Sequence, residues 1–95
     1  MNKTILITGS TDGIGKLAAI KLAKEGHSIY LHGRNAEKLT KLIAEIKSTS
    51  SNENIDGFVA DFSDLEAVKK MSQEVLEKVS SLDVLVNNAG IFNSK

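Results

Sequence analysis

A glycine-rich segment near the amino terminus has residue types and spacing that could bind an anion. It reads TGSTDGIG over residues 8–15, directly after an apolar run at residues 5–7. Gly9 would permit a tight turn, Gly13 would let backbone approach a phosphate, and Gly15 would let a helix pack closely on a sheet. Two hydroxyl side chains are further candidate donors, those of Ser10 and Thr11. The segment predicts a helix amino terminus that binds a phosphate group, and the alternative is a plain turn.

The segment His32-Gly33-Arg34-Asn35 bears on which dinucleotide would bind. An NAD site usually has a carboxylate here for the adenosine ribose, whereas a 2′-phosphate needs a cation instead. Gly33 and Arg34 meet the second condition, so NADP is the expected cofactor and NAD the less favoured one. Alternatively, Arg34 is a solvated charge at a strand end. Asn35 is expected to cap the next helix and could touch the same phosphate.

Two more segments follow predicted strands and could contact the cofactor. Asp61 and Phe62 would lie beside the adenine, where the carboxylate could accept from the exocyclic amine; an ordinary turn fits the spacing equally well. Asn88, Ala89 and Gly90 follow the last apolar run, and their small side chains would let the cofactor lie against backbone. An Asn-Ala-Gly turn is also a common strand end.

Alternating strands and helices must position these residues. Apolar runs predict strands at residues 4–8, 28–32, 55–61 and 82–87. Helical spacing predicts helices at residues 14–25, from 36 to a loop at 48–54, and from a capping box at 63–66 to about 80. This order predicts an α/β fold, a Rossmann-like doubly wound parallel sheet truncated to four strands (order 3-2-1-4) and three helices. A ligand should then bind beyond the carboxyl ends of strands 1 and 4.

Apolar periodicity also predicts which side chains are buried. The second helix should bury Ala36, Leu39, Leu42, Ile43 and Ile46. The third should present an apolar stripe of Leu65, Val68, Met71, Val75 and Val79. Tyr30 and His32 are expected to pack at the second strand, and His27 to be solvated.

Composition limits the function classes. A chain of 95 residues suits one domain, here residues 1–95 as a single NADP-binding unit. Lys plus Arg and Asp plus Glu both number 12, so no net charge attracts nucleic acid or a membrane surface. The sequence has no cysteine and no long apolar run, and we expect a cytoplasmic protein without nucleic-acid or membrane partners.

The motifs TGSTDGIG, HGRN, VADFSD and LVNNAG occur in the order and spacing of the short-chain dehydrogenase/reductase family, and the chain resembles its amino-terminal part. The resemblance implies an NADP-linked oxidoreductase that transfers hydride between nicotinamide and an alcohol or carbonyl substrate. It implies pyrophosphate contacts from Gly9, Thr11, Gly13, Ile14 and Gly15. It also implies that Arg34 lies at the 2′-phosphate, Asp61 and Phe62 at adenine, and residues 88–90 near the nicotinamide ribose.

The sequence departs from the family pattern in two places. Many NADP-preferring members have a basic residue before the middle glycine, where this chain has Asp12. The family's catalytic Ser and Tyr-x-x-x-Lys lie beyond the NNAG motif, and none is identified within these 95 residues. Tyr30 with Arg34 only mimics that spacing, and arginine is a poor proton relay. We therefore assign no catalytic or metal-binding residue and expect no turnover from this chain alone.

Two other function classes are compatible with the same sheet. A non-catalytic nucleotide-binding module could associate with itself through the fourth strand, whose apolar run 84–86 would form an exposed edge. A methyltransferase has a similar sheet but would need an acidic residue where Gly33 and Arg34 stand.

Overall fold

The computed structural model describes residues 2–11 and 13–87, which form a four-stranded sheet with three helices. The elements, in chain order, are β1 (Thr4–Thr8), α1 (Gly13–Lys24), β2 (Ser28–Gly33), α2 (Ala36–Ser50), β3 (Ile55–Val59), α3 (Leu65–Lys78) and β4 (Val84–Asn87). The strands pair in parallel in the order β3-β2-β1-β4. The predicted fold class and strand order are confirmed.

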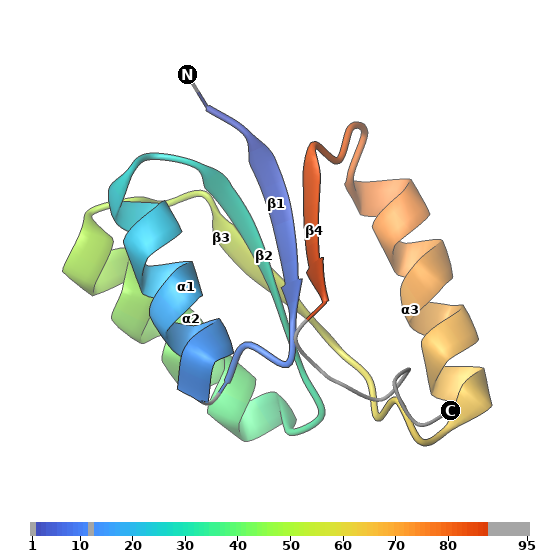
Figure 1. The fold of residues 1–95 in the computed structure, drawn as a ribbon. Coiled ribbons are helices and arrows are strands. Elements are labelled where there is room, and N and C mark those ends of the chain that lie inside the picture. Colours follow the sequence, from blue (N-terminus) through green and yellow to red (C-terminus); the bar gives the residue numbers. More distant parts are fainter. Residues whose placement is uncertain (1, 12, 88–95) are drawn as a thin grey trace.

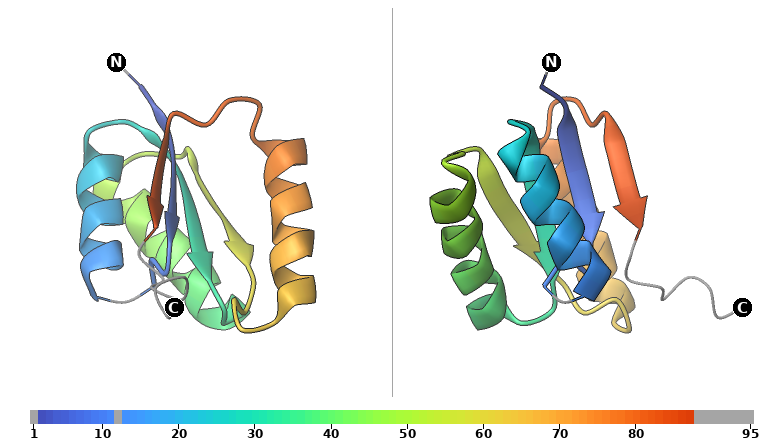
Figure 2. Two further views of the ribbon diagram at one scale, coloured as in Figure 1. Left: turned by 45° about the vertical axis from the view of Figure 1, so that its right-hand side comes forward. Right: turned by 60° about the vertical axis from the view of Figure 1, so that its left-hand side comes forward.

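The helices cover both faces of the sheet. Helices α1 and α2 lie on one face and α3 lies on the other (Figures 1 and 2). This arrangement follows from right-handed crossovers, because the winding direction reverses when the chain passes from β3 across to β4. The reversal leaves the carboxyl ends of β1 and β4 side by side, and Thr8 pairs with Asn87 there.

The larger core lies between the sheet and the α1–α2 layer. Small residues of α1, Ala19 and Ala23, let that helix pack close to the strands. Apolar side chains of the strands and α2 complete this core: Ile5, Ile7, Ile29, Leu31, Leu39, Leu42, Ile46 and Ile55. The α2 stripe is thus confirmed at three positions, with Ile43 partly buried.

The core under α3 is smaller. Its buried members are Leu6, Phe58, Ala60 and Met71, and Met71 is the only buried residue of α3. Val68, Val75 and Val79 are partly buried, in agreement with the predicted stripe. Two buried positions were predicted wrongly, because Leu65 is 68% exposed and Ala36 is exposed. Both are the first residue of their helix, where the Cα–Cβ bond tilts toward the helix amino terminus.

Several element boundaries differ from the sequence prediction. Helix α2 continues to Ser50, although a loop was expected from Ser48, and its C-cap Ser51 has a left-handed φ of 57°. Strand β3 ends at Val59 rather than Asp61. Strand β4 begins at Val84 rather than Leu82.

The ends of α1 and α3 also refine the prediction. Gly26 adopts a left-handed φ of 94° and ends α1, as expected. Helix α3 ends at Lys78, and its N-cap is Asp64, whose side chain accepts from the Glu66 N–H at 3.0 Å. The predicted capping box therefore starts one residue too early, since the Ser63 hydroxyl donates to Asp61 instead.

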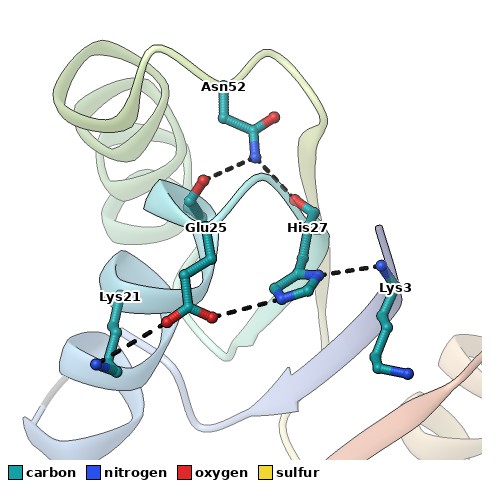
Figure 3. A network of polar contacts seen from close by, with 6 residues as sticks. Lys3, Lys21, Glu25, His27 and Asn52 are labelled. Atoms are coloured by element: carbon teal, nitrogen blue, oxygen red, sulfur yellow. Dashed lines mark hydrogen bonds and ion pairs between the residues drawn. The ribbon is translucent and has the colours of Figure 1, made fainter. Parts of the chain in front are cut away.

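A polar network joins the amino-terminal end of β2 to α1 and to the α2–β3 loop (Figure 3). Asn52 donates to the carbonyls of Ala23 and His27 at 3.0 and 2.8 Å. The His27 side chain is only 13% exposed; its Nδ1 accepts from the Lys3 N–H at 3.0 Å and its Nε2 lies 3.5 Å from a Glu25 carboxylate oxygen. The expectation that His27 is solvated was wrong, because its ring contacts the Lys3 N–H and Glu25.

Candidate functional site

The loops that follow β1, β2 and β3 meet at the carboxyl edge of the sheet. Hydrogen bonds between backbone groups hold them together: the Ser10 N–H donates to the His32 carbonyl at 3.0 Å, and the Ala60 N–H donates to the Gly33 carbonyl at 3.1 Å. The edge therefore brings three of the predicted motifs to one place, as parallel strands require.

The glycine-rich segment has the backbone conformation that its glycines allow. Gly9 and Gly13 have φ values of 62° and 57°, a left-handed region that other residues rarely adopt. Gly13 begins α1, is exposed, and has no atom within 4 Å of the position of a Cβ. Gly15 lies on the buried side of α1 and Ile14 on the exposed side. Asp12 lies outside the described residues.

The first turn of α1 differs in charge from those of α2 and α3, and Asp12, which precedes it in the sequence, lies outside the described residues. The first turn of α1 contains no acidic residue, whereas those of α2 and α3 contain Glu37 and Glu66. Helix amino termini carry partial positive charge and unpaired N–H groups. The residues present thus fit a phosphate group better at α1 than at the other two helices.

Ser10 and Thr11 attach this segment to β2. Ser10 is fully buried, and its Oγ accepts from the His32 N–H at 2.9 Å and donates to the His32 carbonyl at 3.2 Å. Its hydroxyl was expected to be a phosphate donor, but in this structure it pairs with β2. The side chain of Thr11 lies over Gly33, where a Cβ would be 2.6 Å from the Thr11 Cγ2.

His32 is buried between the first and third loops. Its Nδ1 accepts from the Gly9 N–H at 2.9 Å, and its Nε2 lies 2.8 Å from the Ala60 carbonyl oxygen. Its ring stacks on Phe62 with centroids 4.1 Å apart. Burial lowers the pKa of His32 below its ordinary value, and the hydrogen bond to Ala60 opposes that shift. The predicted packing of His32 is confirmed.

The polar residues after β2 and β3 are exposed. Arg34 is exposed, and Asn35 caps α2 as predicted, with its Oδ1 accepting from the Lys38 N–H at 3.0 Å. Asp61 accepts from the Ser63 N–H and hydroxyl at 3.0 and 2.7 Å. These bonds lower the pKa of Asp61, and the charge of Arg34 lowers it further. Asp61 therefore remains a carboxylate with a cation nearby.

Asn88, Ala89 and Gly90, which were predicted to contact the cofactor, lie outside the described residues. Tyr30 packs on Phe58 with ring centroids 5.5 Å apart, which confirms its structural role. The two hydrogen bonds of the His32 ring were missed, and no spacing in the sequence could have indicated them, because their partners come from separate loops.

Neither a metal centre nor a membrane span is found in the part of the chain that the structure describes. No group of three His, Cys, Asp or Glu side chains there could hold a metal ion. No helix there is long and apolar enough to cross a bilayer.

The sequence also matches known proteins. The family model described as short chain dehydrogenase matches residues 3–95. The chain belongs to this family. An uncharacterized oxidoreductase of Schizosaccharomyces pombe is 40% identical over 91 residues, which cover 96% of this chain and 27% of that protein. A 3-oxoacyl-[acyl-carrier-protein] reductase of Staphylococcus aureus is 40% identical over 94 residues, covering 96% of this chain and 37% of the reductase.

Solved structures of the short-chain dehydrogenase type share the same fold. A Pseudomonas aeruginosa RhlG/NADP active-site complex has a TM-score of 0.81 and 30% identity, and the match covers 93% of this chain and 34% of RhlG. The chain thus spans only about a third of the length of the relatives it matches, the part that contains the cofactor-binding region. Membership of the family excludes the methyltransferase alternative.

Proposed function

We propose that this chain is the NADP-binding part of a short-chain oxidoreductase that transfers hydride between nicotinamide and an alcohol or carbonyl carbon. The observation that supports NADP is the exposed side chain of Arg34. This residue follows Gly33 at the carboxyl edge of the sheet, where the glycine-rich segment also lies. The RhlG relative was solved with NADP. A second phosphate needs such a cation, and no carboxylate stands at residues 33–35 to bind a free ribose.

Each part of the cofactor has a proposed place. The amino terminus of α1, with residues 9, 11 and 13–15, would bind the pyrophosphate, and Ser10 would hold that segment in place. Arg34 and Asn35 would contact the 2′-phosphate. Asp61 would accept from the adenine amine, and Phe62 would support the adenine side. Residues 88–90 would lie near the nicotinamide ribose, and the bound nicotinamide would supply or accept the hydride.

Titration of NADP and NAD against Arg34→Ala tests this proposal. A charge-assisted hydrogen bond contributes about 1.5–3 kcal/mol, so the substitution should weaken NADP binding by roughly 10- to 150-fold and leave NAD binding unchanged. Calorimetry of the 95-residue chain would measure both affinities. Lys24→Ala removes an exposed cation from the last turn of α1 and is the matched control. Equal affinities of the unchanged chain for the two dinucleotides would exclude the role of Arg34.

Catalysis and location belong to the same proposal. Tyr30 is the single tyrosine and packs on Phe58, so we expect the chain to bind NADP without turning over a substrate. The alcohol or carbonyl substrate would be bound by the complete enzyme, which we place in the cytoplasm.

A self-associating module is a second candidate, favoured by the apolar face between α3 and β4. A groove of about 390 Å³ lies there, and Leu76, Leu82 and Leu85 are among its lining residues. Leu76 is 80% exposed and Leu85 57% exposed. Strand β4 is also an edge of the described sheet, so its outer backbone groups could pair with a second copy.

A further inference from the structure

The hydrogen bonds of the His32 ring determine its protonation state. A backbone N–H can only donate, so the Nδ1 atom that faces the Gly9 N–H must be an unprotonated acceptor. A carbonyl oxygen can only accept, so the Nε2 atom that faces Ala60 must carry the proton. Only the neutral imidazole with hydrogen on Nε2 satisfies both contacts.

The two contacts connect different parts of the candidate site. Gly9 starts the glycine-rich segment, and Ala60 immediately precedes Asp61. We call the ring with its bonds to Gly9 and Ala60 the His32 bridge. His32 is 4% exposed and stacks on Phe62, so the ring has little freedom to reorient.

We infer that His32 is a positioning residue for dinucleotide binding: as a neutral imidazole, it holds the Gly9 turn against the end of β3. This inference rests on the proposed function, because it assumes that the glycine-rich segment binds the pyrophosphate. His32 itself is buried and would act through Gly9 rather than by touching the cofactor. Protonation of Nδ1 would place two N–H donors face to face, break the bond to Gly9 and loosen the segment that binds the pyrophosphate.

The surroundings of His32 favour the neutral ring. Burial lowers the pKa of His32, which is consistent with the geometry. Among the described residues, Arg34 after β2 and Asp61 after β3 carry charged side chains at the same edge, and both are exposed. The described residues of the loop after β1, Gly9, Ser10 and Thr11, are uncharged, and Asp12 of the same loop lies outside the described residues. Because the folded state disfavours the imidazolium, the pKa of His32 lies below the ordinary histidine value. The bridge is therefore complete at and above that ordinary value and is lost only as the pH falls through the lowered pKa of His32.

The first experiment examines the His32 bridge without cofactor. Nitrogen chemical shifts of the imidazoles in the 95-residue chain should show a proton on Nε2 and none on Nδ1 of His32. The chain has two histidines, so the spectrum of His32→Asn assigns the signals. A proton on Nδ1 at neutral pH would overturn the inference. Because no dinucleotide is present, this result does not depend on the proposed function.

The second experiment measures NADP affinity in two isosteric variants. The Oδ1 of Asn lies near the position of Nδ1 and can accept from Gly9, so His32→Asn should keep most of the affinity. The amide of Gln lies near Nε2 and can donate only to Ala60, so His32→Gln should weaken binding on the order of tenfold. Equal losses in both variants would mean that only packing matters and would contradict the inference.

The pH profile gives a readout that packing alone would not change. Affinity of the unchanged chain should fall as the pH drops below the ordinary histidine range, whereas His32→Asn cannot titrate there. The 2′-phosphate of NADP takes up a proton near about pH 6, so the relevant quantity is the difference between the two profiles. Parallel profiles would overturn the inference.

His27→Asn is the matched control. His27 also accepts a backbone N–H through Nδ1, from Lys3, but it lies at the opposite end of β2 (Figure 3). The NADP affinity of the His27→Asn variant should equal that of the unchanged chain. A loss as large as that of His32→Gln would point to general destabilisation and contradict a local role. If the unchanged chain binds no dinucleotide, the proposed function fails while the imidazole spectrum still tests the His32 bridge.

Discussion

Gly33 bears on the proposed site in two ways. Because glycine has no carboxylate, this position favours binding of a ribose 2′-phosphate over binding of a free ribose hydroxyl. Its lack of a Cβ also makes room for Thr11, since a Cβ there would lie 2.6 Å from the Thr11 Cγ2. This contact brings the glycine-rich segment close to Arg34, and the two halves of the proposed phosphate site depend on it.

Gly33→Ala should therefore destabilise the chain. Either Thr11 or the backbone must move to admit the methyl group, and overpacking of this kind costs about 1–3 kcal/mol. Urea unfolding followed by circular dichroism would measure the change in the free energy of unfolding. Adding Thr11→Ser to Gly33→Ala removes the clashing Cγ2 and should restore most of the loss, with Thr11→Ser alone as the reference. No recovery in the double variant would place the strain elsewhere.

The three helices differ in how their amino termini are satisfied. Side chains cap α2 and α3, through Asn35 to the Lys38 N–H and Asp64 to the Glu66 N–H, both at 3.0 Å. Both helices also have a glutamate in the first turn, and α1 has no acidic residue there. Among the three described helices, α1 is thus the one whose first turn favours binding of an external anion.

Asp64→Ala should destabilise α3 more than Ser63→Ala does. Loss of an N-cap costs about 1 kcal/mol in free energy of unfolding, because a backbone N–H loses its acceptor. Ser63→Ala removes only the hydroxyl bond to Asp61 on the surface, so its effect should be smaller. The same urea unfolding experiment compares the two variants. A larger loss for Ser63→Ala would mean that the cap lies one residue earlier than in the structure.

The whole molecule is asymmetric about its sheet. The α1–α2 face buries a continuous core, whereas α3 buries only Met71 and leaves the groove beside β4 lined with exposed leucines. Exposed apolar patches of this kind mark contact surfaces. The α3–β4 face is therefore where we expect a second copy of this chain to dock.

Light scattering at increasing concentration should detect association of the 95-residue chain. Leu85→Lys places a charge in the groove and should shift the population to monomer, because a buried unpaired ammonium is unfavourable. Leu17→Lys is the control, since Leu17 is exposed on α1 in the opposite layer. A monomer at the highest concentrations, before any substitution, would exclude the self-association proposal.

The sequence by itself determined the number, type and order of the elements, and hence the strand order and the edge where the motifs meet. These features depend on short-range periodicity and on the handedness of crossovers, which a linear pattern records. It failed at the first residues of α2 and α3, which are exposed, and at the cap of α3. The cofactor contacts of the motif residues stay predictions.

Only the tertiary structure decided what the polar side chains of the site do. Ser10 was a candidate phosphate donor, but the fold commits its hydroxyl to β2, 22 residues away. His32 was expected only to pack, but its ring joins Gly9 and Ala60, 23 residues before it and 28 after it. Hydrogen bonds between loops depend on distances in space that no local pattern encodes. For that reason the sequence indicated the candidate site, and the fold assigned its buried hydrogen bonds.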